Sequence, residues 1–591
     1  MSLMSGLFVG ATGLQTSQNS LHTTAHNLSN IETQGYVRQQ TLHADISYNN
    51  ISNAPVSKMQ IGLGVEYDIV RQVRDQFLDK SYRRETGRSS FYEICQETTQ
   101  EIETLLGEFD GVAFQDSIGN LWTSVQELQK DPSSNVTKGS FVNTAAQFIE
   151  RAQAVYNGLT EYQDNLNARV KEYVDRINDL ADEIFSLNDA IHTEELGEQE
   201  ANDLRDSRNK ALDELSALGN ISYFTNADGA TEVIFEGVSL VARDRVFHMD
   251  LKTEQGTGFY VPIWPQNMDA EVFIRDEEIA TEFNTDIGQL KSIILARGDR
   301  RANYTDMKYD AYEKGIYEFY NPDKPGPATK PNDKDYLIPT SKSVVMKVQA
   351  ELDQLVHSIM TEVNNILTGE KDLIDKYYDS SDPSTYLNPD YLPKYKVEDV
   401  KSGAVKLPEE LFVRLGTSRY ETYWDTSTTP NTEYYRYVPE TQNPTHADID
   451  KLYTISNMKI NPTLQKTPSL LGEEFMTEQG EVDHAKADRL ADAFTTEFSS
   501  LSPTLTTKYD YRDYYSALVG QVATEGSVYS SIVSAQQVAT HNLSDSRDQV
   551  MGVSSNEELT NMIKYQNAYN AASRYITACN DMLDRLLSSL G

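Results

Sequence analysis

The sequence predicts an α+β multidomain protein of elongated shape, with a coiled-coil-like helical core formed by both termini and β-rich outer domains inserted in the middle. Apolar residues recur every three or four positions at both ends of the chain, and a longer heptad pattern fills residues 140–191. Strand and turn patterns begin only after residue 219. Helical runs that are separated from strand runs indicate an α+β protein, and a heptad helix of this length is typical of a rod.

An apolar stripe predicts the first helix, which we expect to end near the Asn- and Gly-rich segment 27–35. The average spacing of about 3.5 residues suits a partner helix better than a globular surface. Isolated helices of this length are marginal in water, so the stripe needs something to pack on. Its residues are Leu3, Leu7, Ala11, Leu14, Leu21, Ala25 and Leu28.

A matching stripe predicts the last helix, which follows a capping-box pattern from Ser554 to Glu557. Its residues are Leu559, Met562, Ile563, Tyr569, Ile576, Leu583, Leu587 and Leu590. We expect the two terminal stripes to pack on each other and on other copies of the chain. Residues 1–70 and 549–591 would then form one terminal coiled-coil assembly domain.

The strongest helical pattern holds its heptad from Phe148 to Ile191. One four-residue step, from Leu166 to Val170, replaces an expected step of three, and such a stutter locally unwinds a supercoil. A further helix over about 198–218 is expected to fold back against this rod. We expect one long-helix domain from residues 71–218, 341–368 and 486–548.

The middle of the chain reads as β structure and loops. Strand patterns at 221–224 and 232–235 flank the turn Asn226–Gly229, and further strands are expected at 238–241 and 246–249. We expect a β-rich domain over 219–300, a Pro-containing loop insertion over 301–340 and a Tyr-rich outer insertion domain over 369–485.

The composition argues against several partners and structural features. The chain has 52 Lys and Arg against 90 Asp and Glu, a formal net charge of −38, which disfavours nucleic acid and anionic membranes. Its two cysteines cannot build a disulfide framework. A basic leader is missing before Arg38, and no apolar run approaches the roughly 20 residues of a membrane span.

The sequence offers no motif for catalysis. It lacks the nucleophile-elbow, P-loop and dinucleotide patterns, so we expect no enzyme activity, no cofactor and no catalytic residues. His22 and His26 are four residues apart, but two ligands do not make a metal site. Acid pairs such as Glu557–Glu558 and Glu194–Glu195 are interpreted as solvated helix faces.

Tyrosine clusters in the outer insertion leave two interpretations open. They comprise Tyr377 and Tyr378, Tyr420 with Tyr423 and Trp424, and Tyr434 and Tyr435 with Tyr437. Aromatic side chains of this kind suit carbohydrate binding, but Tyr is also a good strand residue with a polar handle. Packing within a β domain is the simpler interpretation.

The two ends of the chain resemble the axial proteins of the bacterial flagellum. The N-terminal run carries the signature residues Asn27, Asn30, Thr33, Gly35, Tyr36 and Arg38, although His26 stands where Asn is usual. The C-terminal run from Glu557 to Leu583 resembles the second signature of the same family. Lys564-Tyr565-Gln566 and the long helix resemble the hook-associated members more than the hook or rod subunits.

The resemblance implies a structural, non-enzymatic protein that self-assembles at the distal end of the hook, at the junction of hook and filament. It implies four partners: other copies of the chain, the hook protein, a second junction protein of the hook-associated protein 3 type, and a cytosolic export chaperone. It also implies extracellular location after type III export without a cleaved signal peptide, with no membrane insertion.

Two alternatives remain at this stage. The first is a hook or distal-rod subunit, although such subunits tend to lack the long heptad helix. The second is a junction protein whose outer insertion also binds glycan or has hydrolase activity. No catalytic motif supports hydrolysis.

Overall fold

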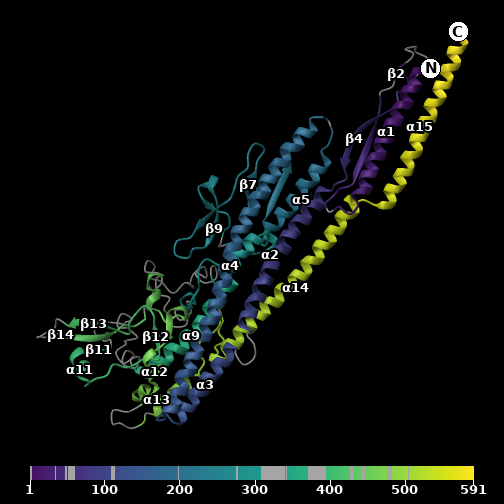
Figure 1. Ribbon diagram of the computed structural model, residues 1–591. Helices are drawn as coiled ribbons and strands as arrows, with labels where there is room; N and C mark the ends of the chain where they lie inside the picture. The colour runs from purple at the N-terminus through teal and green to yellow at the C-terminus, as the bar shows by residue number, and fades with distance from the viewer. Residues whose placement is uncertain are drawn as a thin grey trace, which may run out of the picture.

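The computed structural model is an elongated molecule with both chain termini at one end and the outer insertion at the other (Figure 1). This confirms the predicted placement of the termini. The structure describes residues 3–33, 35–46, 49–50, 60–107, 113–197, 199–274, 277–307, 340, 342–369, 394–425, 431–440, 446–475, 482, 484–502 and 505–590.

A narrow terminal arm is built from the two ends of the chain. We define it as α1 (Leu3–Ser29), β1 (Gln39–Asp45), β4 (Val65–Gln72) and α15 (Ser555–Leu590), with the short strands β2 (Asn49–Asn50) and β3 (Gln60–Ile61). Strand β1 pairs with β4 in antiparallel order, and β2 with β3. Helix α1 packs along α15 (Figure 1).

Small residues make the closest approach between α1 and α15. A Cβ atom added at Gly6 would lie 3.3 Å from the Cys579 sulfur, and one added at Gly10 would lie 2.6 Å from Ile576 Cγ1. Further along, a Cβ at Gly13 would lie 3.8 Å from the Ala572 Cβ. The two helices are therefore antiparallel, and the backbone of α1 sits close to side chains of α15.

The buried residues of α1 continue this face of small side chains. They are Gly10, Thr16, Ser17, Ser20, Thr24 and Asn27. The serine hydroxyls donate hydrogen bonds to backbone carbonyls one turn earlier in α1: Ser17 Oγ donates to the Gly13 carbonyl at 2.7 Å and Ser20 Oγ to the Thr16 carbonyl at 2.9 Å. Buried polar groups of this kind cost little once they are hydrogen-bonded.

Long helices form the body of the molecule next to the arm. They are α2 (Gln76–Leu106), α4 (Asn135–Glu195), α5 (Asn202–Leu218), α9 (Val344–Thr368) and α14 (Tyr511–Met551). The predicted rod is confirmed as α4, which is 61 residues long and therefore roughly 90 Å at 1.5 Å per residue. Asp75, Ser134, Ser343 and Asp510 cap α2, α4, α9 and α14 through their side-chain oxygens.

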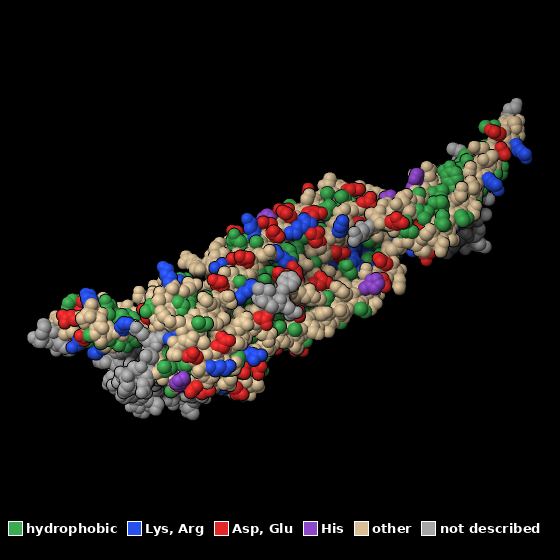
Figure 2. Space-filling view, turned by 60° about the horizontal axis from the view of Figure 1, so that its bottom comes forward, with side chains coloured by type: hydrophobic (Ala, Val, Ile, Leu, Met, Phe, Trp, Pro, Cys, Tyr) green, Lys and Arg blue, Asp and Glu red, His purple; other side chains and the backbone are tan. Residues whose placement is uncertain are grey.

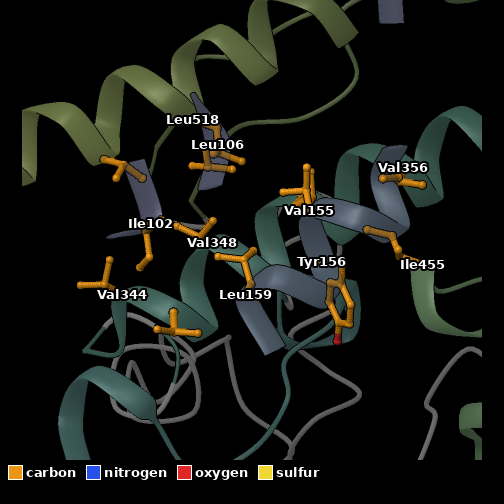
Figure 3. Close-up of a cluster of buried hydrophobic side chains, with 14 of the residues drawn as sticks. Ile102, Leu106, Val155, Tyr156, Leu159, Val344, Val348, Val356, Ile455 and Leu518 are labelled. Atoms are coloured by element: carbon orange, nitrogen blue, oxygen red, sulfur yellow. The ribbon is translucent and has the colours of Figure 1, made fainter. Parts of the chain in front are cut away.

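The apolar faces of these helices meet in one core, part of which is drawn in Figure 3. Val155 and Leu159 of α4 lie beside Val348 of α9, and Leu106 of α2 lies beside Leu518 of α14. All five side chains are at most 3% exposed. Fully burying a side chain of this size contributes about 1.5–3 kcal/mol, so the contact of four long helices stabilises the rod.

Three helices lie where the sequence analysis placed none. They are α3 (Phe114–Lys130), α6 (Gln289–Arg297) and α13 (His484–Ala493). Helix α3 buries Phe114, Ile118, Leu121, Val125 and Leu128, a spacing of three and four that marks one helix face. Trp122 of α3 stacks on Phe494, which follows α13, at 5.6 Å. Helices α3 and α13 extend the core at the end of the molecule away from the arm, whereas α6 packs against α2 in the middle of the body, where Ser292 Oγ donates to the Phe91 carbonyl.

Two three-stranded sheets cover α4 in the region 219–300. The predicted hairpin is confirmed as β5 (Ile221–Thr225) and β6 (Thr231–Phe235), followed by β7 (Val238–Val241). The strand expected at 246–249 is wrong, since the structure has only an isolated bridge between Val241 and Val246 there. The second sheet contains β8 (Asp250–Thr253), β9 (Tyr260–Trp264) and β10 (Ala270–Glu271).

The outer insertion contains short strands and helices. They are β11 (Lys394–Lys396), α11 (Val397–Ser402), β12 (Phe412–Arg414), β13 (Tyr420–Asp425), β14 (Thr432–Tyr437), β15 (Met458–Ile460) and α12 (Pro462–Lys466). The described tyrosines pack on one another, with Tyr420 edge-on to Tyr395 and Tyr437. This arrangement favours the packing interpretation. Tyr377, Tyr378 and most of the loop insertion 301–340 lie outside the described residues.

The glycine contacts on α1 give a matched pair of substitutions. Gly10→Ala places its methyl group against Ile576, and overpacking of this kind costs about 1–3 kcal/mol. Gly13→Ala meets only an ordinary contact with Ala572 and gains about 0.8–1.0 kcal/mol of helix propensity. Hydrogen exchange of the purified chain should therefore be faster across α1 in Gly10→Ala than in Gly13→Ala. Equal exchange in both variants would contradict the close contact of Gly10 with Ile576 between α1 and α15.

Candidate assembly surface and its joint

The signature residues near the end of α1 form a joint between the arm and the body. Both polar atoms of the Asn27 side-chain amide are hydrogen-bonded. Its Oδ1 accepts from the Tyr36 hydroxyl at 2.8 Å and from the Gln39 backbone amide at 3.0 Å. Its Nδ2 donates to the Gln39 carbonyl at 2.9 Å. These bonds fix the reversal of the chain from α1 into β1, and Gly35 supplies the left-handed backbone (φ 84°) that the reversal requires.

Asn30 and Thr33 tie the turn back onto the helix. Asn30 Nδ2 donates to the His26 carbonyl at 3.1 Å, and Thr33 Oγ1 donates to Asn30 Oδ1 at 3.1 Å. The His26 ring meets the Tyr36 ring edge to face, and its Nδ1 lies 3.0 Å from the Tyr36 hydroxyl. This turn therefore holds Tyr36 against the end of α1.

Arg38 connects the N-terminal half of the joint to α15. Its guanidinium lies 2.7 Å from Glu557 and 3.0 Å from Glu558, and its backbone amide donates to the Met551 carbonyl at 2.8 Å. Glu558 is only 2% exposed, so the interpretation of this acid as part of a solvated face is wrong. A buried carboxylate is stable only when paired, and Arg38, 520 residues earlier in the chain, is its partner.

Asp206 of α5 attaches the joint to the body. It accepts hydrogen bonds from the Val37 amide at 3.1 Å and from Gln72 Nε2 at 2.7 Å. Burial raises the pKa of this carboxyl to about 7. Burial also raises the pKa of the nearby Tyr36, followed in size by the charges of Asp203, Asp206 and Glu558. The arm is thus held by polar contacts to α5 rather than by an apolar core.

A network of ion pairs between α2, α5 and α14 lies next to the joint. Arg547 near the end of α14 lies 3.0 Å from Asp79 of α2 and 3.0 Å from Asp213 of α5. Its guanidinium also stacks over the Tyr82 ring at 4.3 Å, and Arg83 binds Asp213 at 2.6 Å. Charged groups from three helices therefore meet where the arm leaves the body.

A cleft of about 310 Å³ opens beside the joint. Its lining residues are His26, Asn30, Thr33, Gly35, Tyr36, Asp203, Asp206, Ser207 and Lys210. Within the described part of the chain, no group of three or more His, Cys, Asp or Glu is placed to hold a metal ion. The signature residues in the cleft wall hydrogen-bond to one another and to the backbone of the turn.

The outer flanks of the arm expose large apolar side chains. Of the predicted interface residues on α15, Leu559 is 48%, Ile563 61% and Leu587 65% exposed. Sequence reasoning missed Phe8, Tyr575, Met582 and Leu586, which are also exposed on the arm. Figure 2 shows hydrophobic side chains gathered on the narrow end of the molecule. A patch of this kind marks an interaction surface.

The remaining predicted interface residues lie between the buried seam and these flanks. Leu7, Leu14, Leu21 and Leu28 on α1, and Met562, Tyr569, Ile576 and Leu583 on α15, are half-buried, while Ala11 and Ala25 are exposed. The side chains of Leu3 and Leu590 lie outside the described residues. Pairing of the α1 leucines with neighbouring copies stays a prediction, since glycines make the closest contact within one chain.

None of the described helices has the length and apolar character that crossing a bilayer demands. The exposed apolar residues of α15 lie on a helix that also carries Asp, Glu, Lys and Arg, as in Asp581, Asp584 and Arg585.

Comparisons with known proteins match both the long-helix body and the last helix of the arm. The family model "Flagellar hook-associated protein FlgK helical domain" matches residues 99–377, and "Flagellar basal body rod FlgEFG protein C-terminal" matches residues 549–589. The first covers α4, α5, α9 and the end of α2, and the second covers nearly all of α15. The two matches thus fall on the long-helix body and on the candidate assembly surface.

Curated relatives match along the full chain. Flagellar hook-associated protein 1 of Bacillus subtilis is 23% identical over 594 residues, which covers 100% of this chain and 99% of the relative. The protein of the same name from Salmonella typhimurium is 21% identical and covers 98% of both chains. A solved structure of the flagellar hook junction protein FlgK from Burkholderia pseudomallei is similar at a TM-score of 0.45 and 11% identity, over 80% of this chain and 100% of that one.

The second family model falls on the C-terminal signature, and the full-length relatives cover both signatures. The chain belongs to the axial proteins of the bacterial flagellum, and within them it resembles hook-associated protein 1.

Proposed function

We propose that this chain is a structural subunit of the bacterial flagellum that self-assembles at the distal end of the hook and joins hook to filament. The observation that carries the proposal is the terminal arm, whose apolar flanks one chain leaves exposed. Full-length similarity to proteins named flagellar hook-associated protein 1 supports the location. The role is mechanical, and no residue is assigned to catalysis.

The apolar flanks supply the driving force for assembly. Apolar surface removed from water contributes roughly 25 cal/mol per Å², or about 1.5–3 kcal/mol for a large side chain. Phe8, Leu559, Ile563 and Leu587 are large exposed side chains that neighbouring copies would bury when the arms meet. The half-buried Leu7, Leu14, Leu21 and Leu28 would complete these contacts from the neighbouring α1.

Four kinds of partner follow from a place between hook and filament. Other copies of the chain would pack along the arm, the hook protein would contact the assembly on one side, and a second junction protein of the hook-associated protein 3 type on the other. A cytosolic export chaperone would cover the apolar α15 before assembly. With both cysteines free, no disulfide obstructs export of the unfolded chain without a cleaved signal peptide.

Deletion of the chain tests this function directly. Electron microscopy should show hooks without filaments, and flagellin should accumulate in the medium, because the filament lacks its attachment. Loss of the hook itself would move the chain to the hook or distal-rod class. Intact filaments would contradict the structural role.

Complementation of that deletion with Ile563→Asp tests the assembly surface. Ile563 is 61% exposed, so the purified variant should fold normally, but burying an unpaired charge between copies is costly. We expect few or no filaments and loss of swimming. Val136→Asp is the matched control, because Val136 is 80% exposed at the start of α4, away from the arm. Normal swimming by the Ile563 variant would refute the surface.

A further inference from the structure

Helix α14 has an outer face that the proposed arm contacts do not use. Its inner face packs on α2, where Val522 and Val533 are buried, Gly526 lies against Thr99 and Tyr529 lies near Tyr92. The opposite face repeats at the same helical spacing and is exposed from Val528 to Asn542. We define this outer face as Val528, Ser531, Ser534, Ala535, Val538 and Asn542.

Charge is absent from this part of the helix. Residues 526–544 contain no Lys, Arg, Asp or Glu, although such residues make up 24% of the chain. Only one other stretch of the sequence is as long without them, and it is residues 1–31, which contain α1. The two uncharged stretches are therefore the first helix of the arm and the helix that leads into the arm.

Electrostatics gives this coincidence a physical meaning. Each copy carries a net charge of −38, so copies that pack side by side repel one another over most of their surfaces. Like charges placed in an interface add desolvation costs to that repulsion. Neighbouring copies are therefore expected to meet where charge is missing. Exposed valines on such a face, 52% for Val528 and 61% for Val538, add apolar surface to bury.

The outer face also continues the arm. Helix α14 ends at Met551 and α15 begins at Ser555, so the two faces belong to successive helices along one edge of the molecule (Figure 1). Residues 526–544 span roughly 28 Å at 1.5 Å per residue. A contact that starts on the arm can therefore extend along the body.

We propose that the outer face of α14 packs against the body of a second copy of this chain. This inference rests on the proposed function and adds a body contact to the arm contact. Small side chains at Ser531, Ser534 and Ala535 allow a neighbouring helix to approach closely, and the two valines seal the ends of the contact. The body contact aligns neighbouring copies, while the arm contact holds them together.

Thiol labelling of Ser534→Cys measures this contact in the native assembly. The native cysteines give little background, since Cys579 is buried and burial raises the pKa of the Cys95 thiol to about 11. We expect maleimide to label Ser534→Cys readily in the purified chain and at least about tenfold more slowly in isolated hook–filament junctions. Val136→Cys, on an exposed turn of α4, should label equally in both.

A thiol-to-amine crosslinker at the same position identifies the occupant. The expected adduct has twice the mass of the chain. An adduct with the hook protein or with another junction protein would overturn the proposal, as would unchanged labelling in the assembly. A double variant that combines Val528→Glu with Val538→Glu should reduce the number of filaments, whereas Val136→Glu should not.

These outcomes separate the inference from the proposed function. If deletion of the chain removes filaments but the double glutamate variant builds normal ones with Ser534→Cys fully reactive, the junction role stands and the α14 contact is wrong. If deletion leaves filaments intact, the junction role fails first.

Discussion

The close approach of α1 to α15 is the contact on which the rest of the arm depends. Gly6, Gly10 and Gly13 bring the backbone of α1 against Tyr575, Ile576 and Ala572, so the two helices pack with small residues inside. That choice has a direct consequence for the leucines. Because the inner face of α1 is taken by glycine, serine and threonine, its leucines are only half-buried, and Leu559, Ile563 and Leu587 of α15 stay exposed.

The joint fixes how the arm is oriented relative to the body. Arg38, Asn27 and Tyr36 bind the end of α1, the start of β1 and the start of α15 to one another. Asp206 then ties the same point to α5. Polar contacts depend on orientation more strongly than apolar ones do, so the joint sets the angle at which the arm leaves the body.

Sequence periodicity was sufficient for the long elements and insufficient for the division of faces. The heptad from Phe148 to Ile191 predicted α4, because a long uninterrupted apolar pattern has few alternatives. Hydrophobic spacing predicts leucines at the contacts of the terminal helices; within one chain glycines make the closest approach, and the leucine contacts with other copies stay a prediction. A repeat of Gly6, Gly10 and Gly13 was present, but leucine dominates any reading based on hydrophobicity. Helix α3 also carries an apolar pattern with helical spacing, from Phe114 to Leu128, that sequence alone makes detectable.

The contacts of the joint could not be derived from sequence, since they unite residues as far apart as Arg38 and Glu558. An acid pair on a helix is usually solvated, and only the fold reveals that one member is buried. The signature residues were found through resemblance, while their task as fasteners emerged from the geometry. The exposed valines of α14 likewise acquired meaning only once the opposite face was seen to pack on α2.

The most direct measurement is a high-resolution electron cryomicroscopy map of the native hook–filament junction. The account predicts that Leu559 and Ile563 are buried against α1 of a neighbouring copy, while Gly10 stays against Ile576 of its own chain. A map in which the α1 leucines pack on α15 of the same chain, with Leu559 and Ile563 facing solvent, would contradict it.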